Sequence, residues 1–393
     1  MSSPIYLSAR EAAAELGVQA ATLYAYVSRG LIRSVPGPGK QRRYDAADVR
    51  RLMDRKSPGD EVGTSPSAND PILETRLTLI TDEGHFYRGI PALELAATSS
   101  LEAVATLLWD CSDDPFASEF GPVLTDFPAG AGPLERLMAA LAVWPTLDPS
   151  AYTLSPRLLR RKGGALLRLG VTALLGVPIS SATVHEGIGA AWQVDPEVEG
   201  LLRAALVLSA DHELNTSAFA VRCAASTRAP LHAALISGVG AFAGPRHGAS
   251  IDRVNAWLSE IRDVEDVRIV LNARLQRGEP LPGFGHTIYS ATDPRAACLL
   301  DLLASRRTSD PFIAVAREIV GTADELFGVG PNIDFALAVA QRALDLPPDA
   351  GKVLFCAGRM VGWIAHALEQ YQARELIRPR AAYIGERPKG IRF

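Results

Sequence analysis

Apolar residues recur at helical spacing through most of the chain beyond residue 72. The clearest positions are Leu101, Val104, Leu107 and Leu108; Leu134, Leu137, Ala140 and Leu141; Val198, Leu201, Leu202, Ala205 and Leu206; Ala336, Ala340 and Ala343; and Val361, Ala365 and Leu368. Residues three and four apart share one face of a helix, so the pattern predicts a mainly α-helical body. Strand-like alternation is confined to short pieces such as Thr75 to Ile80. The segment with Gly238 and Gly240 has neither the preceding strand nor the third glycine of a dinucleotide-binding loop. The sequence therefore argues against a nucleotide-binding Rossmann fold.

A different set of elements is predicted near the N-terminus. Ser8 and Glu11 have the spacing of a capping box, which predicts a first helix. A second helix is predicted over residues 20–29, and residues 31–44 predict a β-hairpin with a basic tip, followed by a third helix. Two helices joined by a short turn and followed by a hairpin have the pattern of a winged helix-turn-helix.

The distribution of charge separates these two parts. The whole chain has a net charge of −4 and is 48% hydrophobic, which is enough to bury a large core. Residues 1–58 hold ten Lys and Arg against five Asp and Glu, a net of +5, which leaves −9 for residues 59–393. A stretch rich in Ser, Pro, Gly and Asp lies between them and is typical of a linker. The sequence therefore predicts a basic domain at 1–56, a linker at 57–71 and an acidic body at 72–393.

The basic domain resembles the winged helix-turn-helix of MerR-type and excisionase-type proteins. The residues that carry the resemblance are Ala12 to Val18, Thr22-Leu23-Tyr24, Gly30-Leu31-Ile32, and Arg43-Tyr44 before Asp48-Val49. It implies a DNA complex in which Thr22, Tyr24 and Arg29 face the major groove, while Lys40, Arg42 and Arg43 contact phosphates. The alternative is a helical interaction module that does not touch DNA, because the second helix carries a single cation.

Cysteines and apolar runs indicate the compartment. The four cysteines, Cys111, Cys223, Cys298 and Cys356, form no C-x-x-C pair and predict buried, reduced thiols. The N-terminus has no apolar signal segment, and the apolar run from residue 229 to 245 is too short and too rich in Gly and Pro for a membrane span. A cytoplasmic protein without a membrane partner is expected.

Candidate chemistry lies around four of the seven histidines. His212, His247, His286 and His366 each lie in a polar or glycine-bearing cluster, whereas His85, His185 and His232 have ordinary neighbours and are expected to be structural or on the surface. Histidine can carry or lend a proton near neutral pH. No pair of histidines has the spacing of metal ligands on a helix, so no metal is predicted. Asp334 follows a Gly-rich break and enters the next helix, where a carboxylate is commonly a cap.

Taken in order, these clusters resemble the citrate synthase family. The matching motifs are Asp211-His212-Glu213 with Asn215 and Ser217; Gly244-Pro245 with His247-Gly248; Pro282 to His286 with Asp293-Pro294-Arg295; Asn332 with Asp334-Phe335; Arg359 with Gly362-Trp363 and His366; and Arg378-Pro379-Arg380 before Tyr383. The resemblance covers residues 72–385 and implies a mainly α citrate-synthase fold, with a large domain and a small domain inserted at roughly residues 225–335.

The resemblance also implies a reaction, in which citrate synthases join the methyl carbon of acetyl-CoA to the ketone carbon of oxaloacetate. It implies that the catalytic residues are Asp334 as the base, His247 as the partner of the thioester oxygen, and His286 as the group that polarises the ketone. It implies that the substrate carboxylates are bound by His212, Arg295, Arg359 and Arg378. The neighbouring subunit contributes the last of these in the family, so a homodimer is implied, with acyl-CoA and oxaloacetate as substrates and no further cofactor.

Several functions stay open. The substrate can be acetyl-CoA or, as in 2-methylcitrate synthases, propionyl-CoA, because one methylene changes binding by only about 1–3 kcal/mol. A DNA-binding regulator whose citrate-synthase body senses a metabolite is the alternative from a different class. The chain departs from the family at Arg246, at Ala249-Ser250-Ile251, and over residues 287–292. These departures fall in the expected acyl-CoA contacts and leave the catalytic residue types in place.

Overall fold

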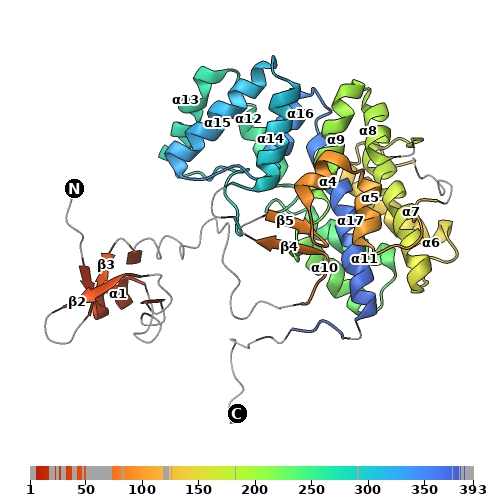
Figure 1. The fold of residues 1–393 in the computed structure, drawn as a ribbon, viewed down its shortest axis with the longest axis horizontal. Helices are drawn as coiled ribbons and strands as arrows, with labels where there is room; N and C mark the ends of the chain where they lie inside the picture. Colours follow the sequence, from red (N-terminus) through yellow and green to blue (C-terminus); the bar gives the residue numbers. More distant parts are fainter. Residues whose placement is uncertain are drawn as a thin grey trace, which may run out of the picture. The chain divides into compact units, whose positions relative to one another are not determined.

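The computed structural model describes residues 6–16, 23, 26–27, 32–37, 42–46, 48–49, 73–81, 84–117, 124, 126–181, 183–289, 292–373, 375–379, 381 and 385. The chain divides into two compact units, Met1–Ser65 and Pro66–Phe393. The fold of each unit is drawn in Figure 1.

The first unit holds a small antiparallel sheet beside a helix. Strands β1 (Tyr6–Ser8), β2 (Ser34–Pro36) and β3 (Arg42–Asp45) pair in the order β1-β3-β2, and α1 (Ala9–Glu15) follows β1. The predicted capping box is confirmed, because the Ser8 amide donates to Glu11 Oε2 at 2.7 Å and the Glu11 amide donates to Ser8 Oγ at 3.3 Å. The pairing of β2 with β3 confirms the predicted hairpin. Strand β1 was not predicted, since its three residues show no alternation long enough to detect.

A small apolar core holds this unit together. It is made by Ala12, Leu16, Leu23, Ile32, Tyr44 and Val49. Of the predicted DNA contacts, Arg42 and Arg43 are exposed on β3. The other four, Thr22, Tyr24, Arg29 and Lys40, lie outside the described residues.

The second unit begins with a short antiparallel sheet and continues as helices. The sheet has the order β4 (Thr78–Thr81), β5 (Gly84–Tyr87) and β6 (Ile90–Pro91). The helices are α4 (Ala92–Thr98), α5 (Leu101–Leu108), α6 (Pro133–Leu147), α7 (Pro156–Leu175), α8 (Val184–Trp192), α9 (Pro196–Ser209), α10 (Thr216–Ser226), α11 (Leu231–Phe242), α12 (Ser250–Leu258), α13 (Val264–Gln276), α14 (Pro294–Arg306), α15 (Pro311–Phe327), α16 (Ile333–Ala343) and α17 (Ala350–Gln372).

Helix α17 is the centre of this unit. It is buried along nearly its whole length and packs on α5, α7, α9, α10, α11 and α16. Helices α12 to α16 pack mainly on one another and form a separate group at the upper left in Figure 1. This group is joined to the rest by contacts of α16 and α12 with α17 and of α14 with α9. The candidate residues lie along these joins.

The predicted mainly helical body is confirmed. The five apolar stripes fall on α5, α6, α9, α16 and α17, and nearly all of their residues are buried. The run that holds Gly238 and Gly240 is α11, as the absence of a dinucleotide-binding loop predicted. Helical periodicity was decisive here because these stripes face a single large core.

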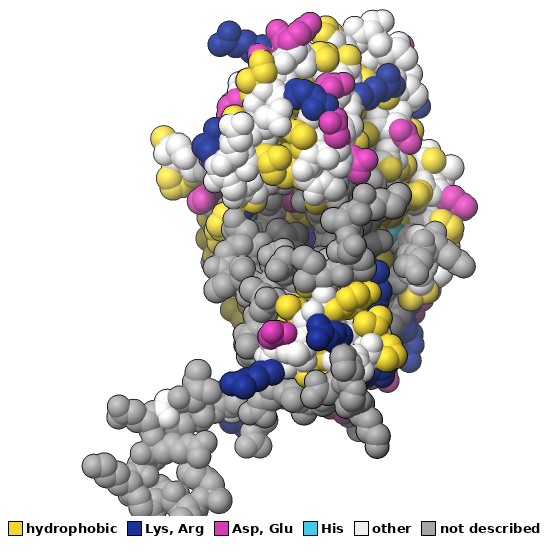
Figure 2. Space-filling model, turned by 90° about the vertical axis from the view of Figure 1, so that its left-hand side faces the viewer, with side chains coloured by type: hydrophobic (Ala, Val, Ile, Leu, Met, Phe, Trp, Pro, Cys, Tyr) yellow, Lys and Arg dark blue, Asp and Glu magenta, His cyan; other side chains and the backbone are white. Residues whose placement is uncertain are grey.

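The remaining observations on the fold concern its surface charge, membrane spans and cysteines. In the upper part of Figure 2, basic and acidic side chains are interspersed on the described surface. Exposed ion pairs among the described residues include Arg268 with Glu325 and Arg277 with Glu279. Among the described residues, no helix is long and apolar enough to span a membrane. The four cysteines are free thiols.

Candidate active site

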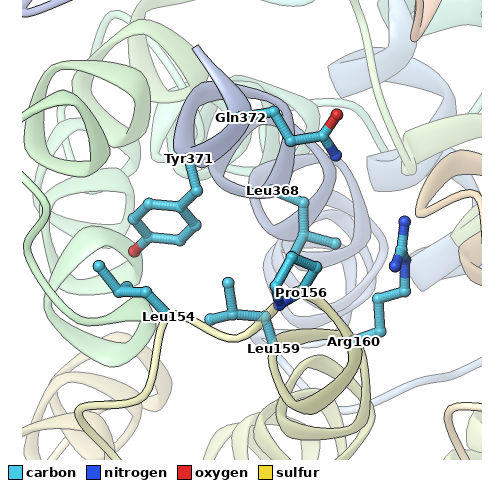
Figure 3. Close-up of a pocket in the computed structure, with 7 residues that line it drawn as sticks. All are labelled: Leu154, Pro156, Leu159, Arg160, Leu368, Tyr371 and Gln372. Carbon is cyan, nitrogen blue, oxygen red and sulfur yellow. The ribbon is translucent and has the colours of Figure 1, made fainter. Parts of the chain in front are cut away.

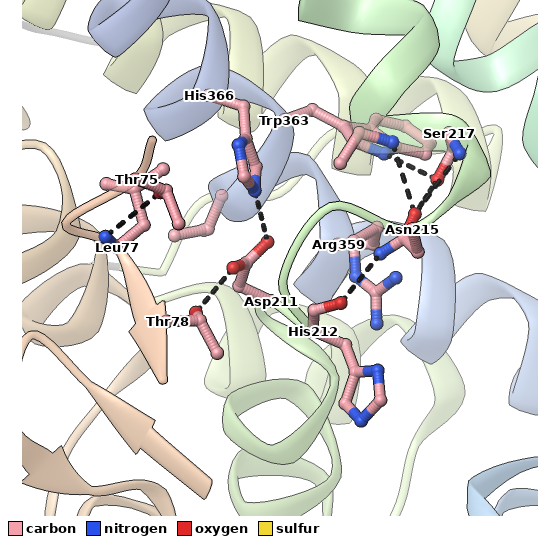
Figure 4. A network of polar contacts seen from close by, with 12 residues as sticks. Thr75, Leu77, Thr78, Asp211, His212, Asn215, Ser217, Arg359, Trp363 and His366 are labelled. Atoms are coloured by element: carbon pink, nitrogen blue, oxygen red, sulfur yellow. Dashed lines mark hydrogen bonds and ion pairs between the residues drawn. The ribbon is translucent and has the colours of Figure 1, made fainter. Parts of the chain in front are cut away.

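The loop between α9 and α10 is anchored by Asp211. Its side chain accepts a hydrogen bond from the Thr78 hydroxyl of β4, and its Oδ1 lies 3.2 Å from Nε2 of His366 on α17 (Figure 4). The Asp211 amide donates to the Tyr87 hydroxyl of β5 at 3.2 Å. Burial alone would raise the pKa of Asp211, but His366 and Arg359 hold that pKa below its ordinary value. Three separate segments therefore fix the position of the next residue, His212.

His212 lies among other aromatic rings at the mouth of this loop. Its Nε2 is 3.0 Å from the Tyr289 hydroxyl, and its ring centroid is 5.1 Å from that of His286 and 5.4 Å from that of His85. Burial, followed by the charge of Arg295, lowers the pKa of His212 well below its ordinary value. His212 is therefore uncharged at neutral pH and offers a hydrogen bond rather than a positive charge.

His247 is oriented by a chain of polar contacts that begins at the start of α10. Ser217 Oγ lies 2.8 Å from both Asn215 Oδ1 and His247 Nε2. The indole N–H of Trp363 donates to the same Ser217 oxygen at 3.0 Å (Figure 4). Burial, followed by the charge of Arg359, lowers the pKa of His247 to about 4. The imidazole is thus neutral and fixed in orientation.

Gly248 allows this arrangement because the backbone next to His247 passes very close to a ring. A Cβ at this position would lie 2.3 Å from atoms of the Phe242 ring. Such a contact is far inside van der Waals distance, so only glycine fits here.

His286 follows a turn that requires glycine. Gly283 and Gly285 have φ angles of +88° and +75°, a region that side chains rarely adopt. The Ile288 amide donates to Nδ1 of His286 at 3.0 Å. Burial, followed by the charge of Arg295, lowers the pKa of His286 to about 4. Because the neutral ring accepts at Nδ1, its proton resides on Nε2, which is free to donate to a substrate oxygen.

Asp334 lies in the first turn of α16. The sequence suggested that it caps this helix, but the cap is Asn332, whose Oδ1 accepts from the Asp334 amide at 3.0 Å. The carboxylate is therefore not used as a cap, and its buried Oδ1 has no hydrogen-bond partner among the described residues. Burial raises the pKa of Asp334 to about 7, against the opposing effects of Arg295 and of a side-chain hydrogen bond from Ser250. A carboxylate with this pKa is suited to proton abstraction near neutral pH.

Two buried arginines complete the charge of the site. Arg295 is 2% exposed and donates from Nε and NH2 to the two oxygens of Asp293, at 3.0 and 2.7 Å. Arg359 is 1% exposed, donates to the Ser209 carbonyl at 2.9 Å and lies over the Phe355 ring. Burial lowers the pKa of Arg359 to about 10, so its guanidinium is still charged at neutral pH. Arg295 is paired directly with a carboxylate, whereas the charge of Arg359 is opposed by Asp211 without a direct contact among the described hydrogen bonds.

The structure brings most of the predicted residues together. Contacts or charge interactions join His212, His247, His286, Asp334, Arg295 and Arg359. Arg378 is exposed in the segment after α17, and no contact with the other site residues is seen in the described part of the chain.

Three further residues join the cluster without a clear signal in the sequence. Tyr289 and Asp293 contact predicted site residues, and only their nearness to His286 and Arg295 in sequence hinted at this. His85 was expected to be structural or on the surface, yet it lies beside His212. His85 lies on β5, 127 positions before His212, so no local sequence pattern indicates that the two rings are neighbours.

One hollow of the second unit lies apart from this cluster. A small hollow between α7 and α17 is lined by Leu154, Pro156, Leu159, Arg160, Leu368, Tyr371 and Gln372 (Figure 3). It shares none of its lining residues with the cluster described above. Within the described ranges, His, Cys, Asp and Glu side chains form no group of three that could hold a metal ion.

Comparison with protein families gives two matches. The family model described as "Citrate synthase, C-terminal domain" matches residues 68–380, about four fifths of the chain. The model described as "Helix-turn-helix domain" matches residues 6–57.

Individual relatives agree with these matches. The chain is 36% identical over 198 residues to a citrate synthase of Synechocystis, which is 49% of this chain and 50% of that protein. In this match and in those to several other citrate synthases, the chain spans about half the length of the relative. It is 27% identical over 344 residues to 2-methylcitrate synthase 2 of Corynebacterium glutamicum, covering 78% of this chain and 90% of that protein. The fold is also that of citrate synthase from Thermoplasma acidophilum in a ternary complex with carboxymethyl coenzyme A and oxaloacetate, with a TM-score of 0.70 at 22% identity over 82% of this chain and 96% of that chain.

Proposed function

The chain belongs to the citrate synthase family, and we propose that it condenses acetyl-CoA with oxaloacetate and water to give citrate and CoA. The observation that supports this most directly is the carboxyl group of Asp334. It has a pKa of about 7 and lies in a site that also holds three neutral imidazoles and two buried arginines. An α-proton of a thioester is only weakly acidic, so its removal needs both a base and stabilisation of the developing oxyanion.

The first step is enolisation of the thioester. Asp334 takes a proton from the methyl carbon, and His247 donates a hydrogen bond to the thioester oxygen. The Ser217 hydroxyl donates to Asn215 Oδ1 in the structure, so the proposal requires this hydroxyl to turn its one proton to Nε2 of His247, 2.8 Å away. The proton of neutral His247 would then reside on Nδ1, which is the nitrogen that has to donate to the substrate oxygen.

The second step forms the new bond. The enolate carbon attacks the ketone carbon of oxaloacetate, and the electron pair of the C=O π bond moves to the ketone oxygen. That oxygen is stabilised by a hydrogen bond from Nε2 of His286 and takes up one proton, equivalent to the one that Asp334 removed, to become the hydroxyl of citryl-CoA. Water then cleaves the citryl thioester and CoA leaves as the free thiol. Arg295 and Arg359 would neutralise the two carboxylates of oxaloacetate, with His212 as a neutral donor beside them.

A thiol-release assay tests this function. Purified protein with oxaloacetate and acetyl-CoA should release CoA, and Asp334→Ala should lose nearly all of this activity. The matched control is Asp324→Ala, which removes an exposed carboxylate on α15 and should leave the rate unchanged. Absence of CoA release from the wild-type protein with either acetyl-CoA or propionyl-CoA would contradict the proposal.

Propionyl-CoA is the alternative acyl donor. The similarity to 2-methylcitrate synthase 2 over most of both chains favours it as a specific second candidate. The two functions differ by one methylene, which is worth about 1–3 kcal/mol or a factor of 10–200 in kcat/KM. The ratio of kcat/KM for the two donors in the same assay decides between them.

A DNA-binding regulator is the alternative from another class, and the helix-turn-helix match favours it. The exposed Arg42 and Arg43 on β3 would contact phosphates. Affinity for duplex DNA should then fall steeply as salt is raised, and Arg42→Ala with Arg43→Ala should reduce the slope of that dependence. No binding even at low salt would exclude this role, and enzymatic activity would be compatible with either result.

Subunit organisation is part of the proposal. We expect a cytoplasmic homodimer in which Arg378 enters the partner's site, and a smaller domain at roughly residues 225–335 that closes over the substrates. Co-expression of Asp334→Ala with Arg378→Ala chains tests the shared site. If Arg378 acts across the interface, a mixed dimer has one intact site and activity returns. If each chain completes its own site, both sites of the mixed dimer are defective and activity stays absent.

A further inference from the structure

His85 is a buried imidazole that the proposed reaction does not use. It lies on β5 and is 2% exposed. The edge-to-face contacts of its ring are with Tyr87, at 4.8 Å between centroids, and with His212, at 5.4 Å. Together with His286 it forms a row of three imidazoles along the site.

Neither ring nitrogen of His85 has a hydrogen-bond partner among the described residues. Buried polar groups are nearly always paired, and an unpaired donor retains its full desolvation cost. Burial, followed by the charge of Arg295, lowers the pKa of His85 to about 3. The ring is thus neutral, with one N–H to donate and one nitrogen that can accept.

The surrounding polar groups are already committed to other contacts. The Tyr87 hydroxyl donates to the Val207 carbonyl at 2.9 Å. Asp211 is held by Thr78 and His366, and Asp293 is held by Arg295. The charges that act on His85 come from Arg295, Arg359, Asp211 and Asp293. These groups lie around the place where the two carboxylates of oxaloacetate are proposed to bind. A partner for His85 is therefore to be sought in the ligand of that site.

We propose that His85 is a further substrate-binding residue, whose N–H donates to a carboxylate oxygen of the 2-oxo dicarboxylate bound beside His212. This inference rests on the proposed function, since it assigns His85 to the same substrate. The opposing view is that His85 only packs against His212 and Tyr87. A phenylalanine would preserve that packing and remove both nitrogens, so the two views predict different results for the same variant.

The experiment measures binding of oxaloacetate alone, by calorimetry without acyl-CoA. His85→Phe should weaken the affinity by about 10- to 100-fold, which is typical of losing one hydrogen bond to a charged group. His85→Gln keeps an N–H donor and should recover part of the loss. The matched control is His185→Phe, a half-buried histidine on α8 whose Nδ1 is also unpartnered, and it should bind as the wild type does.

Stability without ligand provides a second readout. Because His85→Phe removes two unpaired buried nitrogens, its ligand-free melting temperature should equal or exceed that of the wild type, while the increase in melting temperature caused by oxaloacetate should shrink. Equal affinity of wild type and His85→Phe for oxaloacetate overturns the inference and leaves the proposed function intact. Absence of oxaloacetate binding to the wild type overturns both. If His85→Phe fails to fold, His85→Gln is compared with His85→Ala instead. Should the glutamine variant bind oxaloacetate as weakly as the alanine variant, the inference is also overturned.

Discussion

Replacing the proposed base by its uncharged counterpart should stabilise the folded protein at high pH. An ordinary aspartate has a pKa of about 3.9, whereas burial raises the pKa of Asp334 to about 7. The folded protein therefore holds this proton more tightly than the unfolded chain does. The stabilising contribution of the protonated group is complete below about pH 4 and is lost as the pH rises to about 7.

The size of the effect follows from the two pKa values. At about 1.4 kcal/mol for each pKa unit, the raised pKa lowers the free energy of unfolding by about 4 kcal/mol at pH 8 and by about 1.5 kcal/mol at pH 5, relative to a group that does not titrate. Asp334→Asn has no charge to ionise and avoids the cost at every pH. Its advantage in free energy of unfolding over the wild type should thus grow by about 3 kcal/mol from pH 5 to pH 8, although it should have lost CoA release.

Urea unfolding followed by tryptophan fluorescence at pH 5, 6, 7 and 8 measures this difference. Asp324→Asn, which removes an exposed carboxylate on α15, is the matched control. If the difference between wild type and Asp334→Asn is the same at pH 5 and pH 8, the carboxylate is not destabilised by burial. The reasoning that makes Asp334 a base near neutral pH would then be refuted.

Three further variants test residues near the starts of α10 and α12. Ser217→Ala removes the hydroxyl 2.8 Å from the His247 ring, and kcat measured by CoA release should fall about 10- to 100-fold with a smaller change in the KM for oxaloacetate; a change in KM alone would contradict this orienting role. Ser250→Ala removes a hydrogen bond that lowers the pKa of Asp334, so the acidic limb of the pH profile of kcat/KM should move upward by about one pH unit, and an unmoved limb would show that the hydroxyl does not act on the base. Gly248→Ala places a methyl group against a phenylalanine ring, so its free energy of unfolding in urea should drop by about 1–3 kcal/mol; unchanged stability would mean that this close approach relaxes freely.

The helical part of the fold was predictable because its signal is local. The stripes on α5, α6, α9, α16 and α17 each face one large core, so their 3.6-residue period appears directly in the sequence. Short strands carry less signal, and β1 was missed because three residues define no alternation. The capping box at Ser8 and Glu11 was found because both partners lie within one turn.

The site residues were predictable as types and only partly as an arrangement. The order of the histidine, arginine and aspartate motifs indicated the family before any geometry was known. It did not show that Asn332, not Asp334, caps α16, because both residue types are common at that position. Nor did it show that Arg295 is paired with Asp293 while Arg359 bonds a carbonyl.

The sequence by itself determined a basic helix-turn-helix module, a mainly helical body and the residues of a citrate-synthase-like site. Only the tertiary structure decided which of those residues are charged and which residues from distant parts of the sequence lie beside them. It made His247 and His286 neutral and raised the pKa of Asp334, and it set His85 against His212. The physical reason is that desolvation and ring contacts depend on which distant segments pack together, and a local sequence pattern does not specify that packing.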